Sequence, residues 1–242
     1  MLNTAKKALV TLMFAATVSA ALAKGGDARV RVVHASPDAP AVDILVNGSP
    51  AIENLKFGNV SPYAPLPAGV YDVEVVPAGL AAPVVIDLTG PNAVNLFYNR
   101  DYTAIAVGNL SSISPILLAD DNRPVAKSSA RVRFVHASPD APAVDIAVVG
   151  GPILFKNVSF KGVGDYVTVP AGQYNLEVRL AGTSTVALSV PGVMLDGGTV
   201  YTVYATGYAF GTPSLNPVVS VDSVRPGMKN GQGKGMENGG DR

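Results

Sequence analysis

The sequence predicts an all-β protein with two tandem immunoglobulin-like or prealbumin-like β-sandwich domains behind a cleaved signal peptide. Apolar and polar residues alternate with a period of two in many short runs, of which Arg29–His34 is typical. Turn residues interrupt these runs about every eight to twelve positions. One decapeptide, HASPDAPAVD, occurs twice, at 34–43 and at 136–145. The duplication predicts two modules of the same architecture.

The expected segments follow from this repeat and from shifts in composition. They are a signal peptide at 1–23, a first sandwich at 28–119, a linker at 120–129, a second sandwich at 130–222 and a disordered Gly-rich tail at 223–242. Because the linker is short and contains Pro124, we expect the two modules to lie close together with restricted motion.

The first 23 residues have the three parts of a secretory signal. Lys6 and Lys7 supply the positive charge, and the apolar run Ala8–Val18 is too short to anchor a protein in a bilayer. Ala21-Leu22-Ala23 matches a cleavage site, which would leave Lys24 as the mature N-terminus. We therefore expect a secreted protein, or one of the periplasm or cell envelope.

Composition excludes several classes of function. The 18 basic and 18 acidic residues balance, and no basic run offers a surface for nucleic acid. The absence of cysteine excludes disulfides, thiolate metal sites and a lipidated mature N-terminus. No apolar run after residue 23 is long enough to cross a bilayer, so the chain is not expected to span a membrane after signal cleavage.

The expected strands occur in a similar order in both halves. In the first half they are Arg29–His34, Val42–Val46, Tyr71–Val75, Val84–Ile86, Ala93–Tyr98, Tyr102–Val107 and Ile116–Ala119. In the second half they are Arg131–His136, Val144–Val148, Tyr166–Val169, Tyr174–Leu180, Val186–Val190 and Tyr201–Tyr208. A Pro-Ala-Gly-x-Tyr element, at 67–71 and 170–174, predicts a turn that leads into a strand.

The motif His-Ala-Ser-Pro-Asp-Ala-Pro-x-Val-Asp, in tandem behind a signal peptide, resembles the domain-of-unknown-function family numbered 4397. The resemblance covers roughly Arg29 to Ala119 and Arg131 to Val221. It implies a bacterial or archaeal envelope or secreted protein with repeated all-β domains. No established activity comes with the family name, so it transfers no functional residues.

Strand parity places the two histidines. His34 shares a strand face with Val30 and Val32, and the second copy has Phe134 in place of Val32. That face is therefore the buried one, and we expect His34 and His136 at the inner edge of their sandwiches. Their ring nitrogens need partners. Candidates are backbone groups of the next turn, or the carboxylate of the fifth residue of the motif.

A structural interpretation explains every residue of the motif, which we read as a hydrogen-bonded corner. Its members are His34, Ser36, Pro37, Asp38 and Asp43, repeated as His136, Ser138, Pro139, Asp140 and Asp145. Pro37 fixes its own φ, and Asp38 can accept backbone hydrogen bonds. Asp43 faces away from its apolar neighbours, and Arg29 or Arg31 would be its partner if the two strands pair.

A metal or small-ligand site is the alternative for the same corners. The candidate ligands are His34, Asp38 and Asp43, with His136, Asp140 and Asp145 in the second copy. Zinc usually takes at least three protein ligands, and parity turns the last aspartate of each set away. The clustered oxygen ligands of Asp120-Asp121-Asn122 would suit calcium, but a solvated hinge is the favoured interpretation. The sequence predicts no cofactor.

The sequence favours a non-enzymatic binding or structural module of the envelope or extracellular space. The chain has only two histidines and no Gly-x-Ser-x-Gly, His-Glu-x-x-His or phosphate-loop motif, so a hydrolase ranks third, behind the metal- or ligand-binding protein. The partner is unknown; an envelope glycan or protein is possible. Tyr98, Tyr102 and Tyr208 are candidate carbohydrate platforms, but Tyr102 and Tyr201 are expected to be half-buried core residues.

Overall fold

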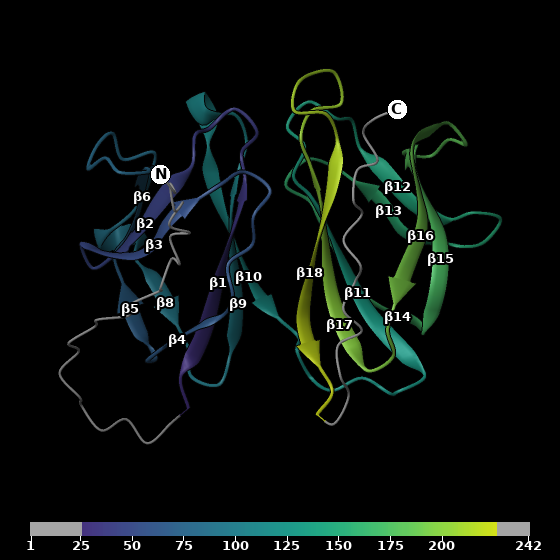
Figure 1. Ribbon diagram of the computed structural model, residues 1–242, viewed down its shortest axis with the longest axis horizontal. Coiled ribbons are helices and arrows are strands. Elements are labelled where there is room, and N and C mark those ends of the chain that lie inside the picture. The colour runs from purple at the N-terminus through teal and green to yellow at the C-terminus, as the bar shows by residue number, and fades with distance from the viewer. Residues whose placement is uncertain (1–25, 227–242) are drawn as a thin grey trace, which may run out of the picture.

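The computed structural model describes residues 26–226, and the expected signal peptide and most of the expected tail lie outside this range. The chain is all β, and four four-stranded sheets form four layers in space (Figure 1). Strands β1 to β10 form the first module, and β11 to β18 form the second. No helix within residues 26–226 is long and apolar enough to cross a membrane.

The first module pairs the sheet β10-β9-β1-β4 with the sheet β3-β2-β6-β7, and a two-stranded sheet β5-β8 extends it. Its strands are β1 (Ala28–Ala35), β2 (Val42–Val46), β3 (Ser49–Leu55), β4 (Ala64–Leu66), β5 (Gly69–Tyr71), β6 (Val73–Pro77), β7 (Ile86–Leu88), β8 (Val94–Leu96), β9 (Asp101–Val107) and β10 (Ser114–Asp120). Two short 3₁₀ turns, Gly90–Asn92 and Leu110–Ser112, connect strands.

The second module pairs β14-β11-β17-β18 with β13-β12-β15-β16. Its strands are β11 (Ser129–His136), β12 (Val144–Val148), β13 (Ile153–Val158), β14 (Val163–Pro170), β15 (Gly172–Leu180), β16 (Val186–Leu195), β17 (Thr199–Thr206) and β18 (Asn216–Val224). The two modules share one topology, because β1 runs parallel to β9 just as β11 runs parallel to β17. The long strand β15 takes the place of β5 and β6 together.

Each module has its own apolar core, and a third core lies between the modules. This third core joins Val33, Ala35, Ile105 and Val107 of the first module to Val135, Ala137 and Tyr204 of the second. The sheet containing β1, β9 and β10 therefore packs face to face on the sheet containing β11, β17 and β18 (Figure 1). Both faces of β1 and β11 are consequently buried, one in the module core and one between the modules.

The expected turns explain the local geometry. Asn47 and Gly48 both have positive φ, 50° and 73°, as a two-residue hairpin turn requires. In the Pro-Ala-Gly-x-Tyr elements, the Tyr71 hydroxyl donates to the Pro67 carbonyl and the Tyr174 hydroxyl donates to the Pro170 carbonyl, both at 2.7 Å. The element therefore closes a turn by a side-chain hydrogen bond in both modules.

Several strands differ from the sequence expectation. β3 and β13 were not predicted, because charged and turn-forming residues such as Glu53 and Asn157 obscure their alternation. β18 was also missed, and it continues to Val224, past the expected start of the tail. The expected strand Tyr71–Val75 is two strands that separate at Asp72.

Candidate functional site

The repeated decapeptide forms the corner at which the chain changes sheets. β1 and β2 lie in opposite sheets of the first module, and the motif connects them. The same connection joins β11 to β12 in the second module. Two prolines restrict the loop between the strands, so the corner has few alternative backbone conformations.

His34 is fully buried at the end of β1, with both ring nitrogens bonded to the corner's backbone. Its Nε2 lies 2.8 Å from the carbonyl oxygen of Pro40, which can only accept, so Nε2 carries the proton. Its Nδ1 accepts from the N–H of Ser36 at 3.3 Å. The ring also meets the edge of Phe57, which places it against the apolar interior.

His136 repeats half of this arrangement. Its Nε2 donates to the Pro142 carbonyl at 3.1 Å, and its ring packs against Phe134. Its buried Nδ1 has no hydrogen-bond partner. Burial lowers the pKa of both His34 and His136, and the hydrogen bond to the prolyl carbonyl only partly opposes this effect. Both rings are therefore neutral at pH 7.

Asp43 and Asp145 bind backbone amides, and the predicted partnership of Asp43 with Arg29 or Arg31 is wrong. Asp43 accepts from the N–H of Asn54 at 2.7 Å and from that of Gly79 at 2.8 Å. The strands β1 and β2 lie in different sheets, so the arginines and Asp43 never become cross-strand neighbours. Asp145 accepts from Asn157 and Gly182 in the same way, and these two bonds lower its pKa.

The other aspartate of the motif joins the corner to a more distant loop. Asp38 accepts from the N–H of Leu110 at 2.7 Å, in the connection between β9 and β10. Asp140 accepts from the N–H groups of Ala209 and Phe210 in the corresponding connection between β17 and β18. Burial alone would raise the pKa of Asp140, but these N–H groups outweigh it, so the pKa is lowered.

The described part of the chain does not bring together the candidate metal ligands of the repeated motif. Residues 26–226 contain no group of three or more His, Asp or Glu side chains placed to hold one ion. In each corner the imidazole donates to a carbonyl while the two carboxylates bind amides of different loops. Each corner therefore ties its own backbone to three other backbone segments, which in the first module contain Asn54, Gly79 and Leu110.

The candidate tyrosines divide into two kinds. Tyr102 and Tyr201 are buried, and their hydroxyls accept from the backbone N–H groups of Phe97 and Asp196. Tyr98 is exposed, whereas Tyr208 is half-buried and donates to the side chain of Asn109. Among these four tyrosines, Tyr98 exposes the most of its ring and is the best placed to stack on a sugar.

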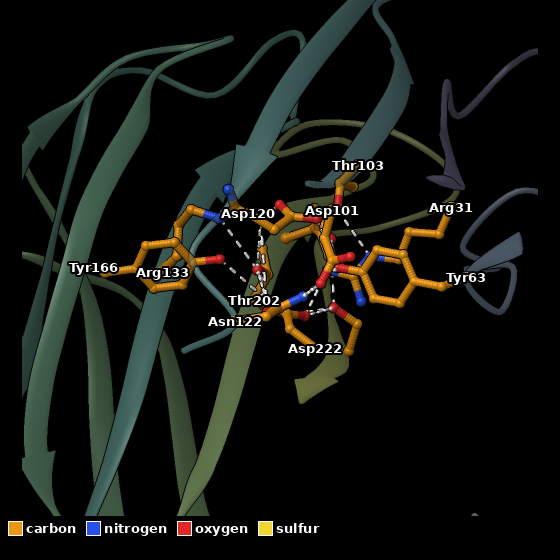
Figure 2. Close-up of polar contacts among 12 residues, drawn as sticks. Arg31, Tyr63, Asp101, Thr103, Asp120, Asn122, Arg133, Tyr166, Thr202 and Asp222 are labelled. Atoms are coloured by element: carbon orange, nitrogen blue, oxygen red, sulfur yellow. Dashed lines mark hydrogen bonds and ion pairs between the residues drawn. The ribbon is translucent and has the colours of Figure 1, made fainter. Parts of the chain in front are cut away.

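A buried network of charged groups between the modules is the functional feature that sequence reasoning missed (Figure 2). Arg31 on β1 pairs with Asp222 on β18, with 2.5 Å between Nη2 and Oδ1. Arg133 on β11 pairs with Asp120 at the end of β10, also at 2.5 Å. All four side chains are at most 4% exposed. The interpretation of Asp120 as part of a solvated hinge is therefore wrong.

The network has an internal pseudo-twofold symmetry. In the first module, Arg31 stacks over the Tyr63 ring at 4.6 Å and donates to Thr103, while Tyr63 and Thr103 both donate to Asp120. The second module repeats this set with Arg133, Tyr166, Thr202 and Asp222. Each arginine therefore rests on its own module and pairs with the terminal strand of the other (Figure 2).

The electrostatics of the network depend on the pairing of each arginine with a carboxylate of the other module. Burial by itself would lower the pKa of Arg31, but the electrostatic interactions with Tyr204 and Asp222 more than offset this effect, and the pKa is raised. Burial also raises the pKa of Tyr63 and Tyr166, so both stay neutral donors. Two guanidinium groups meet two carboxylates, and the buried charge is balanced. Removing either partner of a pair would leave an uncompensated charge in a low-dielectric interior.

The sequence did contain a signal for this network. Arg31 and Arg133 occupy the same position of the repeat and alternate with apolar residues on a strand face opposite His34. Asp120 and Asp222 are likewise 102 residues apart, the same separation as the two copies of the decapeptide. A charge retained at one position of both copies, beside Val33 or Val135, indicates a second buried face.

Comparison with known proteins identifies the family but not an activity. The model of the family described as "Domain of unknown function (DUF4397)" matches residues 28–147 and 147–234. The chain therefore belongs to this family. A search of curated proteins found no match.

Two solved structures show weak similarity. One is the C-terminal domain of AlgF from P. aeruginosa, with 23% identity and a TM-score of 0.28 over 39% of this chain and 97% of that one. The other is the Bacillus anthracis TIE protein, with 14% identity and a TM-score of 0.25 over 76% of this chain. The match covers 34% of the TIE protein chain.

Proposed function

We propose that the chain works outside the cytoplasmic membrane as a rigid, non-enzymatic, two-module unit that holds two binding or attachment surfaces in a fixed geometry. The observation that supports a rigid unit is the buried, pseudo-symmetric network around Arg31 and Arg133, together with the apolar core that the two modules share. Burying a charge is costly unless it is paired, so four buried charges are stable only while the two modules stay in contact. Two modules joined by a flexible linker alone would leave these charges in solvent.

The geometry of the corners supports a structural role for the repeated motif. The Nε2 of both His34 and His136 donates its proton to a prolyl carbonyl, so the basic nitrogen of each ring is Nδ1. In His34 this atom accepts from the N–H of Ser36, and in His136 it is buried, so neither ring presents a general base to a substrate. The aspartates of the motif bind backbone amides from loops and strands of both sheets. The motif therefore restrains the loops at one end of each sandwich relative to both sheets.

The proposed location follows from the expected signal peptide, and the proposed partner is an envelope glycan or protein. Fractionation of cells that produce the full chain is the test of location. We expect the mature protein, with Lys24 at its N-terminus by mass spectrometry, outside the cytoplasm. Full-length protein in the cytoplasm only would exclude the proposal.

Rigidity can be measured directly, because the chain has no native cysteine to interfere with spin labels. Labels at Glu53→Cys and Ser189→Cys would lie on exposed positions of outer strands, one in each module. Double electron–electron resonance should give one narrow distance distribution. The same pair in an Asp222→Asn background should broaden it, whereas the exposed Arg123→Ala change should not. A broad distribution in the parent would overturn the rigid unit.

A further inference from the structure

The second module contains an apolar cavity that the proposed scaffold role does not use. The cavity has a volume of about 380 Å³ and lies between the sheet containing β11, β17 and β18 and the sheet containing β12, β15 and β16. This volume falls in the range of about 300–1,000 Å³ that is usual for small-molecule sites. Its walls are mostly aliphatic, and they include Val132, Ile146, Val178, Leu188, Val190 and Val203.

The equivalent region of the first module is packed more tightly. Val75 and Ile86 are 7% and 5% exposed there, and strand register makes Val178 and Leu188 their counterparts. Val178 and Leu188 are only half-buried. Val85, which precedes Ile86, packs on the first core, whereas the residue before Leu188 is an alanine that lines the cavity. The alanine side chain is shorter than that of valine and fills less of the space between the sheets.

The connection between β17 and β18 contributes an exposed apolar rim to this cavity. Phe210 lines the cavity and yet is 86% exposed, and Val219 on β18 is 53% exposed. Asp140 binds the N–H groups of Ala209 and Phe210, so the loop is held in place by the repeated corner. Exposed apolar side chains around an apolar cavity mark a site that gains free energy when a ligand covers them.

The chemistry of the wall restricts the ligand. The residues lining the cavity include no Asp, Glu, Lys or Arg. His136 lines it as well, and its ring is neutral with Nε2 committed to Pro142. The other polar residues of the wall are Ser138, Thr185 and Asn216. A charged head group would find no counter-ion at this wall, whereas an alkyl chain with a neutral polar end matches it.

We propose that the second module binds a neutral, single-chain aliphatic molecule, such as a long-chain alcohol or acyl ester, in the cavity between its two sheets. The alkyl chain lies against the valines and leucines of β15 and β16. The rim formed by Phe210 and Val219 covers the outer part of the ligand. This site is independent of the inter-module network, so either proposal can fail without the other.

The two histidines provide a built-in pair of probe and control. His136 lines the cavity, and His34 lies in the first module. We would titrate the untagged protein with 1-decanol and follow the imidazole signals by NMR, with decanoate and decyltrimethylammonium as charged analogues. The expected result is a saturable shift of His136 alone, strongest for decanol. No shift up to the solubility limit of decanol, equal shifts of both rings, or equal binding of the charged analogues would overturn the proposal.

A pair of matched variants tests the location of the ligand. Val190→Phe places a larger side chain in the cavity, and Leu88→Phe makes the equivalent change in the first module. The first should weaken decanol binding about tenfold or more, which is about 1.4 kcal/mol, because the larger ring occupies volume that the alkyl chain needs. The second should leave the affinity unchanged. If both variants bind decanol like the parent, the ligand lies elsewhere; the titration of the parent stands even if a variant does not fold.

Discussion

The two modules have the same corner and different cores. Both copies of the decapeptide fix an imidazole on a prolyl carbonyl and two carboxylates on backbone amides. Beneath the corner, the first module buries Val75 and Ile86, whereas the second leaves Val178 and Leu188 half-buried around a cavity. An identical local sequence therefore gives the same hydrogen bonds to the prolyl carbonyl and to the carboxylates, although the Nδ1 of His34 has a partner that the Nδ1 of His136 lacks. It does not fix the packing of strands that lie farther along the chain.

The charged network is common to both modules, whereas the cavity is a feature of the second module. The network of Arg31, Arg133, Asp120 and Asp222 needs both copies, because each arginine pairs with the carboxylate of the other module. The cavity belongs to the second copy. The network thus lies at the interface that both modules form, and the cavity lies within one of them.

The largest expected effect comes from breaking the shared network. Asp222→Asn or Asp120→Asn should each lower the free energy of unfolding by about 3–5 kcal/mol, because a buried arginine loses its counter-charge. The control is Arg123→Ala, which removes an exposed ion pair and should leave the free energy of unfolding unchanged. Chemical denaturation measures all three. Equal stability of the parent and both asparagine variants would show that the exchange of partners does not hold the modules together.

A smaller effect should distinguish the two corners. His34→Ala removes the partners of two backbone groups, whereas His136→Ala removes the partner of one. Leaving a buried backbone group unpaired costs about 1–3 kcal/mol. We expect both variants to be less stable and His34→Ala to lose more. Thermal melts of the two variants test this order. A larger loss of stability in His136→Ala would contradict the assignment of fewer hydrogen bonds to His136.

The smallest effect is a dependence of stability on pH. Burial lowers the pKa of both histidines in the folded chain, so the native state binds fewer protons than the unfolded state. This contribution is complete above the unfolded pKa of about 6.5 and is lost as the pH falls below it. Unfolding free energies measured between about pH 7.5 and pH 5 should therefore decrease with falling pH. A His34→Asn and His136→Asn double variant should show a flatter profile, and identical profiles would contradict this assignment.

Particular residues show why some features could be predicted and others could not. The alternation in Arg29–His34 and the turn at Asn47-Gly48 depend on neighbours in sequence, and both were found. The position of His34 at the inner edge of the sandwich also followed, since parity is a local property of a strand. β3 escaped prediction because its side chains do not alternate cleanly, and its place in the sheet comes from pairing with β2.

The partner of Asp43 was predicted incorrectly for a related reason. Parity correctly turned its side chain away from the core, but it said nothing about which strand lies beside β2. The neighbours of β2 are β3 and β6, and the carboxylate of Asp43 accepts from the N–H of Asn54 on β3 and from the N–H of Gly79 in the turn after β6. Arg31, which was expected there, instead faces the second module.

The sequence by itself determined the all-β class, the duplication and the membership of a family, because these depend on residue order over short distances. Only the tertiary structure decided that Arg31 meets Asp222, 191 residues away, and that the second core holds a cavity. An ion pair across modules depends on how two sheets pack, and a cavity depends on the summed volumes of side chains from several strands. Neither the ion pair nor the cavity can therefore be predicted from a single segment of the chain.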